Sequence, residues 1–261
     1  MKWLVARRLL PGRAPEGEAL PFWQQPGWRV SAGFIAIALA TGLLAVVTQG
    51  VDGAGAGADR VELGRSQPLV KNAAGPDRRA TPGRKTGCRT ADLQTALPKS
   101  APEDVQWREL VGTKVPTSTS AGPLLASGPL WWCFARTPMG AVMAAHVIPT
   151  QIGGSAWRTV ADQQIVTGPR RDFFVAMRST SSDAVSGTPS ASYAGFSVSS
   201  YSADKASVKL LIKGNQGTYF WTSVSVRWED GDWKAVPQRN GSLFQPLSAT
   251  SGTGGFLLWR P

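Results

Sequence analysis

The side chains that could do acid–base or metal chemistry are few and far apart in this sequence. The single histidine, His146, stands in an alanine-rich stretch, and the nearest carboxylates in the predicted helical region are Asp162 and Asp172. A histidine base needs a carboxylate or similar group to orient it, and one histidine excludes the zinc sites that need two or three. We expect His146 to be a structural residue on a helix surface or at the core edge. We predict no catalytic residue, no bound metal and no cofactor.

The closest group of carboxylates is formed by Glu229, Asp230 and Asp232, which surround a glycine. Such a group could hold a cation. However, an Asp-Gly pair between two alternating apolar segments is the usual signature of a two-residue hairpin turn. Turn formation therefore accounts for these residues, and we predict a hairpin here instead of a metal site.

Four residues are predicted as a possible interaction surface. Trp131 and Trp132 are adjacent in a strand-like segment, so they point to opposite faces and one of them is expected to be exposed. Arg170 and Arg171 begin a predicted helix, where an anion could bind. The alternative for this helix start is that Asp172 only stabilises the first turn.

A long uncharged stretch predicts a membrane-spanning helix at residues 30–51. Its 22 residues would reach about 33 Å, enough for a hydrocarbon core of about 30 Å. Residues 1–29 carry five Lys or Arg against two Glu, so the positive-inside rule places them in the cytoplasm. We therefore expect a single-pass protein of the cell membrane with its carboxyl-terminal part outside. The alternative is a cleaved signal peptide.

Residues 52–102 predict a flexible linker, because Gly, Ala, Pro, Arg and Asp dominate and few large apolar side chains occur. The alternative for its distal part, Thr86 to Pro102, which includes Cys88 and Leu93, is attachment to the domain. The net charge of the chain is +11, but its Lys and Arg are spread along the whole sequence. A nucleic-acid interface needs these residues clustered on one face. We therefore expect no direct contact with nucleic acid.

Residues 103–261 predict a folded extracytoplasmic domain of the α+β class. Helical segments are expected at about 141–148, 155–165 and 170–178, followed by strands at 195–201, 206–213, 219–228 and 233–236. Helices followed by antiparallel strands predict helices packed on one curved sheet with a concave face.

The two cysteines, Cys88 and Cys133, are predicted to form a disulfide. Both follow the predicted membrane span and so fall in a compartment where thiols oxidise. With two cysteines in the chain, four-cysteine metal sites and iron–sulfur clusters are excluded. The alternative is two free thiols, with Cys133 buried in a strand.

Two sets of residues carry a resemblance to known families. Val226–Val236, which reads Val-Arg-Trp-Glu-Asp-Gly-Asp-Trp-Lys-Ala-Val, resembles the last hairpin of cystatin-like and nuclear-transport-factor-like domains. Thr137–Ala141 with Ala144-Ala145, and Gly168–Asp172 with Phe174–Ala176, are similar to an uncharacterised family of actinobacterial membrane proteins encoded on integrative and conjugative elements. This second resemblance spans about Cys88 to Trp259. It implies one anchor, a linker and one extracytoplasmic domain, and it brings no catalytic residues.

Two functions remain open at this point. The first is a non-enzymatic, membrane-anchored assembly component of a conjugative DNA-transfer apparatus, resembling at the level of the fold the single-pass scaffold proteins of type IV secretion. Its partners would be proteins of that apparatus, with self-association as a further option. The second is a small-ligand or cell-wall-glycan binding domain, or a cavity enzyme, that uses the concave face of the sheet. A filled cavity with an exposed apolar patch would favour the first, and a cavity with converging polar groups the second.

Overall fold

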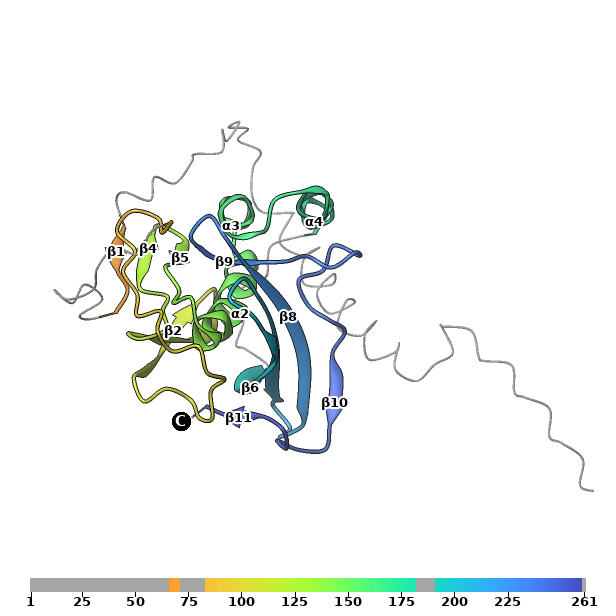
Figure 1. Cartoon of the computed structure of the whole chain (residues 1–261). Coiled ribbons are helices and arrows are strands. Elements are labelled where there is room, and N and C mark those ends of the chain that lie inside the picture. Colours follow the sequence, from red (N-terminus) through yellow and green to blue (C-terminus); the bar gives the residue numbers. More distant parts are fainter. Residues whose placement is uncertain (1–65, 71–82, 182–190, 260–261) are drawn as a thin grey trace, which may run out of the picture. The chain divides into compact units, whose positions relative to one another are not determined.

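The computed structural model describes residues 66–70, 83–181 and 191–259 (Figure 1). The regular structure of these residues is mostly strand, in three antiparallel sheets, together with three helices. The strands are β1 (Gln67–Pro68), β2 (Val105–Leu110), β3 (Thr113–Ser118), β4 (Leu125–Ser127), β5 (Leu130–Trp132), β6 (Ala191–Tyr201), β7 (Lys205–Gly214), β8 (Tyr219–Glu229), β9 (Asp232–Ala235), β10 (Ser248–Thr250) and β11 (Leu257–Leu258). The helices are α2 (Pro138–Ile152), α3 (Trp157–Gln164) and α4 (Pro169–Ser179).

The largest sheet is a meander in which the strand order is β10-β8-β7-β6-β11, with β9 paired to β8. Its long strands alternate between buried and half-exposed residues, as a sheet with one covered face requires. The predicted hairpin between β8 and β9 is present. Asp230 and Gly231 have φ values of 52° and 77°, the positive values that a type I′ turn needs.

Helix α2 covers the inner face of this sheet. Thr137 caps it by accepting a hydrogen bond from the Gly140 amide, and Pro138 occupies the first turn. A Cβ at Gly140 would collide with the Ala135 carbonyl, so only glycine lets the helix start so close to the preceding segment. The helix does not stop at Pro149, as the predicted range 141–148 implies, but runs on to Ile152, although Pro149 has no amide to donate to the Ala145 carbonyl.

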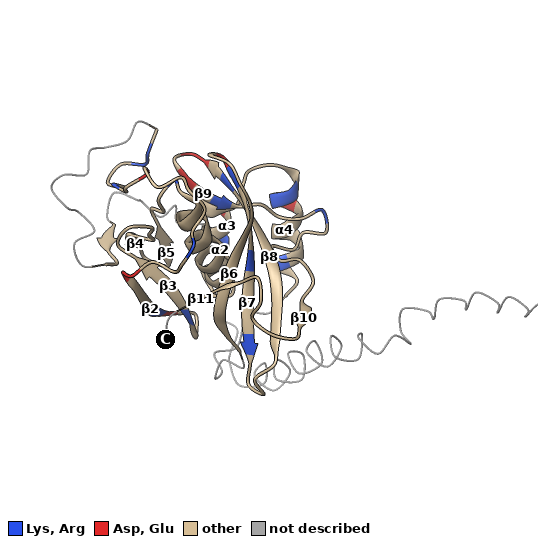
Figure 2. Cartoon of the chain, turned by 60° about the horizontal axis from the view of Figure 1, so that its bottom comes forward, with Lys and Arg blue, Asp and Glu red and all other residues tan. Residues whose placement is uncertain are grey.

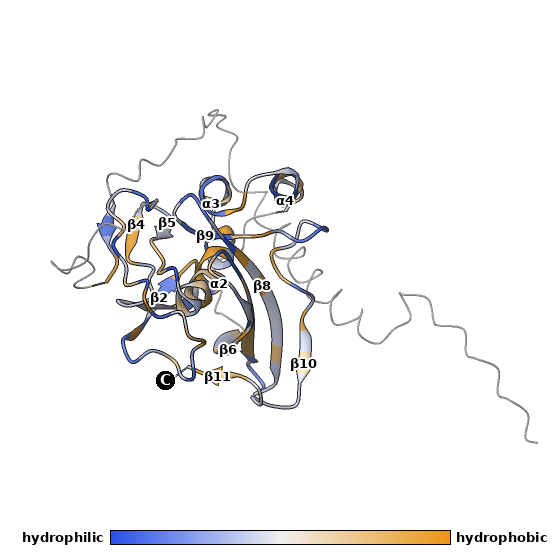
Figure 3. Ribbon diagram, viewed as in Figure 1, coloured by the Kyte–Doolittle hydropathy of each residue, from blue (hydrophilic) through white to orange (hydrophobic). Residues whose placement is uncertain are grey.

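Nearly every side chain of α2 is buried, because sheets lie on both of its sides. The helix contacts β7, β8 and β9 of the large sheet and also β3 and β5 of the two smaller sheets. Figure 3 shows α2 coloured towards the hydrophobic end of the scale, between the sheets, and α3 towards the hydrophilic end. Small side chains such as Ala141, Ala144 and Ala145 let the sheets approach the helix closely.

The predicted α+β fold, with helices packed on one curved sheet as in cystatin-like or nuclear-transport-factor-like domains, is wrong. The described residues are mostly β, and one helix is enclosed by three sheets. The segments Val105–Leu110 and Trp131–Trp132 read as strand-like in the sequence, and they form β2 and most of β5. The two smaller sheets that contain them, β1-β4-β5 and β2-β3, were not predicted. β1 and β4 have two or three residues each, too few for a readable alternation, and β3 contains Pro116, which argues against a strand.

The predicted cytoplasmic segment 1–29 and membrane span 30–51 lie outside the described residues. Within the described residues, no helix is both long enough and apolar enough to cross a bilayer. Part of the predicted linker, residues 83–102, packs against the domain, and its Cys88 and Ala101 are buried. Residues 83–102 are therefore not a flexible linker, and the alternative of a distal part attached to the domain applies to them.

Candidate functional site

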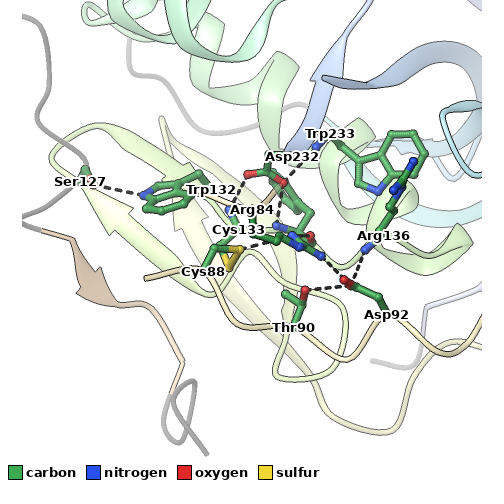
Figure 4. The surroundings of a disulfide bond; sticks show 11 residues. Arg84, Cys88, Thr90, Asp92, Ser127, Trp132, Cys133, Arg136, Asp232 and Trp233 are labelled. Atoms are coloured by element: carbon green, nitrogen blue, oxygen red, sulfur yellow. Dashed lines mark hydrogen bonds and ion pairs between the residues drawn. A yellow bond between two sulfur atoms is a disulfide. The ribbon is translucent and has the colours of Figure 1, made fainter. Parts of the chain in front are cut away.

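The predicted disulfide between Cys88 and Cys133 is confirmed. Cys88 lies in the irregular segment before β2, and Cys133 directly follows β5, with 5.4 Å between their Cα atoms. The bond joins residues 45 positions apart and fixes the segment around Cys88 to the centre of the domain (Figure 4).

Arg84 forms the first half of a charge network around this disulfide. Its guanidinium donates to Asp92 Oδ1 at 2.5 Å and to the Phe134 carbonyl at 2.7 Å. It also lies 4.6 Å from the ring centroid of Trp228, a cation–π contact. Burial would raise the pKa of Asp92, but hydrogen bonds from Arg84 and from the Arg136 amide hold that pKa below its ordinary value. The guanidinium and Asp92 Oδ1 are thus paired inside the protein, whereas Asp92 Oδ2 is buried without a hydrogen-bond partner among the described residues.

Asp232 of β9 forms the second half. Its carboxylate accepts backbone hydrogen bonds from Cys133 at 2.7 Å, Phe134 at 3.0 Å and Trp233 at 2.9 Å. Complete burial raises the pKa of Asp232, and the nearby charge of Lys85 acts in the opposite direction. Cys133 has a φ of 72°, a strained value for a residue with a Cβ, and Asp232 secures that conformation. We call Arg84, Asp92, Asp232 and the disulfide the staple junction.

The potential acid–base residues do not converge. His146 is fully buried in α2, donating from Nδ1 to the Val142 carbonyl at 2.8 Å and packing edge-on against Tyr193 and Trp259. Burial lowers its pKa from 6.5 to about 4. Asp162 pairs with Arg171 on the exposed side of α3, and Asp172 is exposed on α4. No carboxylate among the described residues bonds to His146.

The three carboxylates of the β8–β9 hairpin are used by neighbouring groups. Glu229 pairs with Arg227 and Lys234 and accepts from Thr167, and Asp230 pairs with Lys234. Asp232 points into the staple junction. In the described part of the chain, no group of three potential ligands is arranged to hold a metal ion.

The two tryptophans of the predicted interaction surface occupy different environments. Trp132 is completely buried, and its indole donates to Ser127, so it belongs to the core and cannot form a surface. Trp131 is half-buried, and its backbone is held by two buried glutamines, Gln151 and Gln164. Their network is a structural link between β5, α2 and α3.

The two arginines of that prediction lie on α4, beside exposed apolar side chains. Arg170 is exposed and donates to the Pro237 carbonyl, whereas Arg171 pairs with Asp162. Phe173 and Met177 follow Arg170 by three and seven positions, so they lie on the same side of the helix. These two side chains are 45% and 50% exposed.

The loop after β9 extends this apolar surface. Gly241 of the loop lies against Phe173 and Met177, and the loop then exposes Phe244 and Leu247. We call Phe173, Met177, Phe244 and Leu247 the α4 patch. The last two also line a groove of about 410 Å³ over the inner face of the sheet, and the described residues that line this groove include no charged side chain.

The α4 patch was not predicted, although the sequence of α4 contains a pattern that indicates exposed apolar residues. Phe173 to Met177 are five consecutive apolar residues in a helix. Five consecutive positions cover the whole circumference of a helix, so a helix at the domain surface must expose some of them. Phe174 alone is fully buried.

The sequence profile of the family described as "Domain of unknown function (DUF8175)" matches residues 69–258, and the chain belongs to this family. No curated protein matches the chain, and no solved structure does.

Proposed function

We propose that this member of the family is a non-enzymatic extracytoplasmic assembly domain that binds a protein partner through the α4 patch. The observation that carries the proposal is an exposed apolar patch beside an uncharged groove, on a domain whose sheet is covered by α2. Large apolar side chains that remain exposed together are typical of protein–protein contact sites. Arg170 at the rim adds a charged group that a partner's carboxylate can pair with.

The arrangement of the inner polar groups supports an assembly role over catalysis. His146 faces aromatic rings and has no orienting carboxylate, and its lowered pKa keeps it neutral at pH 7. The carboxylates of the staple junction and of the hairpin accept hydrogen bonds from backbone amides or form ion pairs with Arg or Lys. Groups engaged in this way hold the structure together and leave no acid–base pair for a substrate.

For the apparatus, we propose a membrane-bound conjugative DNA-transfer complex. Support comes from the resemblance to proteins of integrative and conjugative elements and from the uncharged, basic-flanked segment 30–51. The disulfide fits an oxidising compartment outside the cytoplasm. In this arrangement the membrane segment anchors the chain in the bilayer, and the α4 patch recruits a protein of the complex.

The function is tested in a host whose element transfers at a measurable rate. We expect a clean deletion to abolish transfer, and we expect rescue by the full chain but not by residues 1–102. The double variant Phe173→Ser/Met177→Ser should lower transfer at least about tenfold, as loss of central apolar contacts does. The control is Leu93→Ser/Leu97→Ser, which removes two apolar side chains elsewhere that are even more exposed, at 93% and 56%. Transfer that is unchanged by the deletion would refute the proposal.

The location is tested separately on intact protoplasts. Added protease should remove the distal domain and leave residues 1–29 protected. A protected distal domain would reverse the orientation, and a soluble mature form would show that the segment is cleaved.

A further inference from the structure

The outward-facing positions of β7 and β8 carry mostly lysines, serines and two aromatic rings, together with Leu211, which is completely buried. On β7 and β8 the residues facing α2, such as Val208 and Val224, are buried, and their neighbours in the sequence face the other way. The outward-facing set includes Lys209 and Lys213 of β7 and Tyr219 and Trp221 of β8. Lys213 lies opposite Tyr219 in the ladder, and Lys209 Nζ is 4.5 Å from the ring centroid of Trp221. We call these four residues the outer face.

The outer face has no acidic counterpart. β6, β7, β10 and β11 contain no Asp or Glu, and Glu229 at the end of β8 is paired with Arg227. Figure 2 shows the same distribution, with basic positions along β7 and acidic ones gathered at the β8–β9 end. Within the described residues neither Lys209 nor Lys213 forms an ion pair. Their positive charge is therefore directed to solvent.

A cleft of about 780 Å³ begins where the outer face ends. Lys213 and Tyr219 belong to both, and the cleft adds Trp107, Lys114 and Trp259. The described residues that line it include no carboxylate. Trp259 is 7% exposed, and its indole N–H has no hydrogen-bond partner among the described residues, so a donor remains unused beside the cleft.

The chemistry of this surface matches an acidic saccharide. Indole and phenol rings offer flat apolar faces on which a sugar ring can pack, and they add polar edges. Ammonium groups pair with carboxylates or phosphates. Lys209 and Lys213, four positions apart, are separated by about 13 Å along the strand, so they reach different units of an extended polymer. Ser207, Ser223 and Ser225 point to the same side and supply hydroxyl groups for sugar oxygens.

We propose that the outer face and the adjoining cleft bind an acidic polysaccharide of the extracytoplasmic space. The disulfide favours a ligand of that compartment over nucleic acid. The volume of the cleft falls in the range of small-ligand sites, so it accommodates one end or one unit of the polymer. This site goes beyond the proposed assembly role, since none of its residues belongs to the α4 patch.

The test measures binding of the purified full chain to polygalacturonate, a uronic-acid polymer, by calorimetry, with neutral dextran of equal length as the reference. We expect polygalacturonate to bind, dextran to bind at least about tenfold more weakly, and salt to reduce the binding. Lys209→Gln/Lys213→Gln should lower the affinity about tenfold. Trp221→Ala should lower it several-fold without changing its salt dependence. Lys99→Gln, which removes one positive charge at an exposed site off the sheet, should have no effect.

Three results would overturn this inference. They are equal binding of dextran and polygalacturonate, an equal loss with Lys99→Gln, and tighter binding of single-stranded DNA or of anionic vesicles than of the acidic glycan. Circular dichroism of each variant separates loss of binding from loss of fold. DNA transfer in the Lys209→Gln/Lys213→Gln strain distinguishes this site from the assembly role, because the assembly role predicts that transfer depends on the α4 patch.

Discussion

The staple junction and the outer face place the same kind of contact in opposite environments. At the staple junction, Arg84 lies 4.6 Å from the ring centroid of Trp228, and on the outer face Lys209 lies 4.5 Å from that of Trp221. Arg84 is also bonded to a carboxylate, a carbonyl and a sulfur atom, whereas Lys209 has no anionic partner among the described residues. A buried cation bonded to several neighbours holds the chain together, and a half-buried one without an anionic partner is available to a ligand.

This difference sets the scale of expected effects. Breaking a buried hydrogen-bonded network leaves groups without partners and costs several kcal/mol, whereas a charge at the surface contributes little to stability. Substitutions at the staple junction should therefore lower stability far more than substitutions on the outer face. Ligand binding should instead depend on the outer face and not on the staple junction.

The largest effect is expected from removing the disulfide. Cys88→Ala/Cys133→Ala opens a loop of 45 positions, and the chain-entropy argument gives a loss of about 4 kcal/mol. The free energy of unfolding is measured by urea denaturation, and the wild-type protein under reducing agent provides the comparison. A loss below about 1 kcal/mol would mean that the charge network alone fixes the segment around Cys88.

The next largest effect is expected from Asp232→Ala. Three backbone amides lose their acceptor, and Lys85 loses a neighbouring negative charge, so we expect a loss of about 3 kcal/mol. That figure is at the low end for buried charges, because Lys85 is only partly buried. Urea denaturation measures it, with Asp162→Asn as the exposed control. Equal stability of the two variants would show that Asp232 does not support the junction.

The staple junction also shows how far sequence reasoning reaches. The pairing of Cys88 with Cys133 was predictable, because the chain has two cysteines and the predicted location outside the cytoplasm favours their oxidation. The role of Asp232 was not, because turn chemistry already explained an acidic residue next to Gly231. The carboxylate reaches residues 133 and 134, about a hundred positions away, and nothing local in the sequence records that contact.

The fold was predictable in its long elements and not in its short ones. β6, β7 and β8 have ten or eleven residues, long enough for alternation to be read, and a strand was expected within each of them. The position of α2 between sheets was not predictable, because its partners β3 and β5 are short or contain proline. Since the faces of those sheets decide which tryptophans are buried, Trp132 could not be assigned to the core from the sequence.

His146 extends the comparison to a buried group that is neutral. Its pKa of about 4 in the fold, against about 6.5 when unfolded, means that the unfolded chain binds the proton more tightly. The corresponding stability is fully present above pH 6.5 and is lost as the pH falls towards 4, by about 3 kcal/mol. We measure unfolding at pH 7 and pH 4 for the wild type and for His146→Gln. The variant should show a smaller drop, and an equal drop would place the pH dependence in carboxylates.

The smallest effect on stability is expected on the outer face, and it completes the comparison. Lys209→Gln keeps most of the side chain over Trp221 and removes a charge that has no anionic partner among the described residues, so the free energy of unfolding should change by less than about 0.5 kcal/mol. Arg84→Gln, the same charge change at the staple junction, should cost about 2 to 3 kcal/mol, because Asp92 and the Phe134 carbonyl lose a donor. Urea denaturation of both variants at the same ionic strength gives the difference directly. If Lys209→Gln were as destabilising as Arg84→Gln, the outer face would contribute to the stability of the fold, and its lysines would not be free for a ligand.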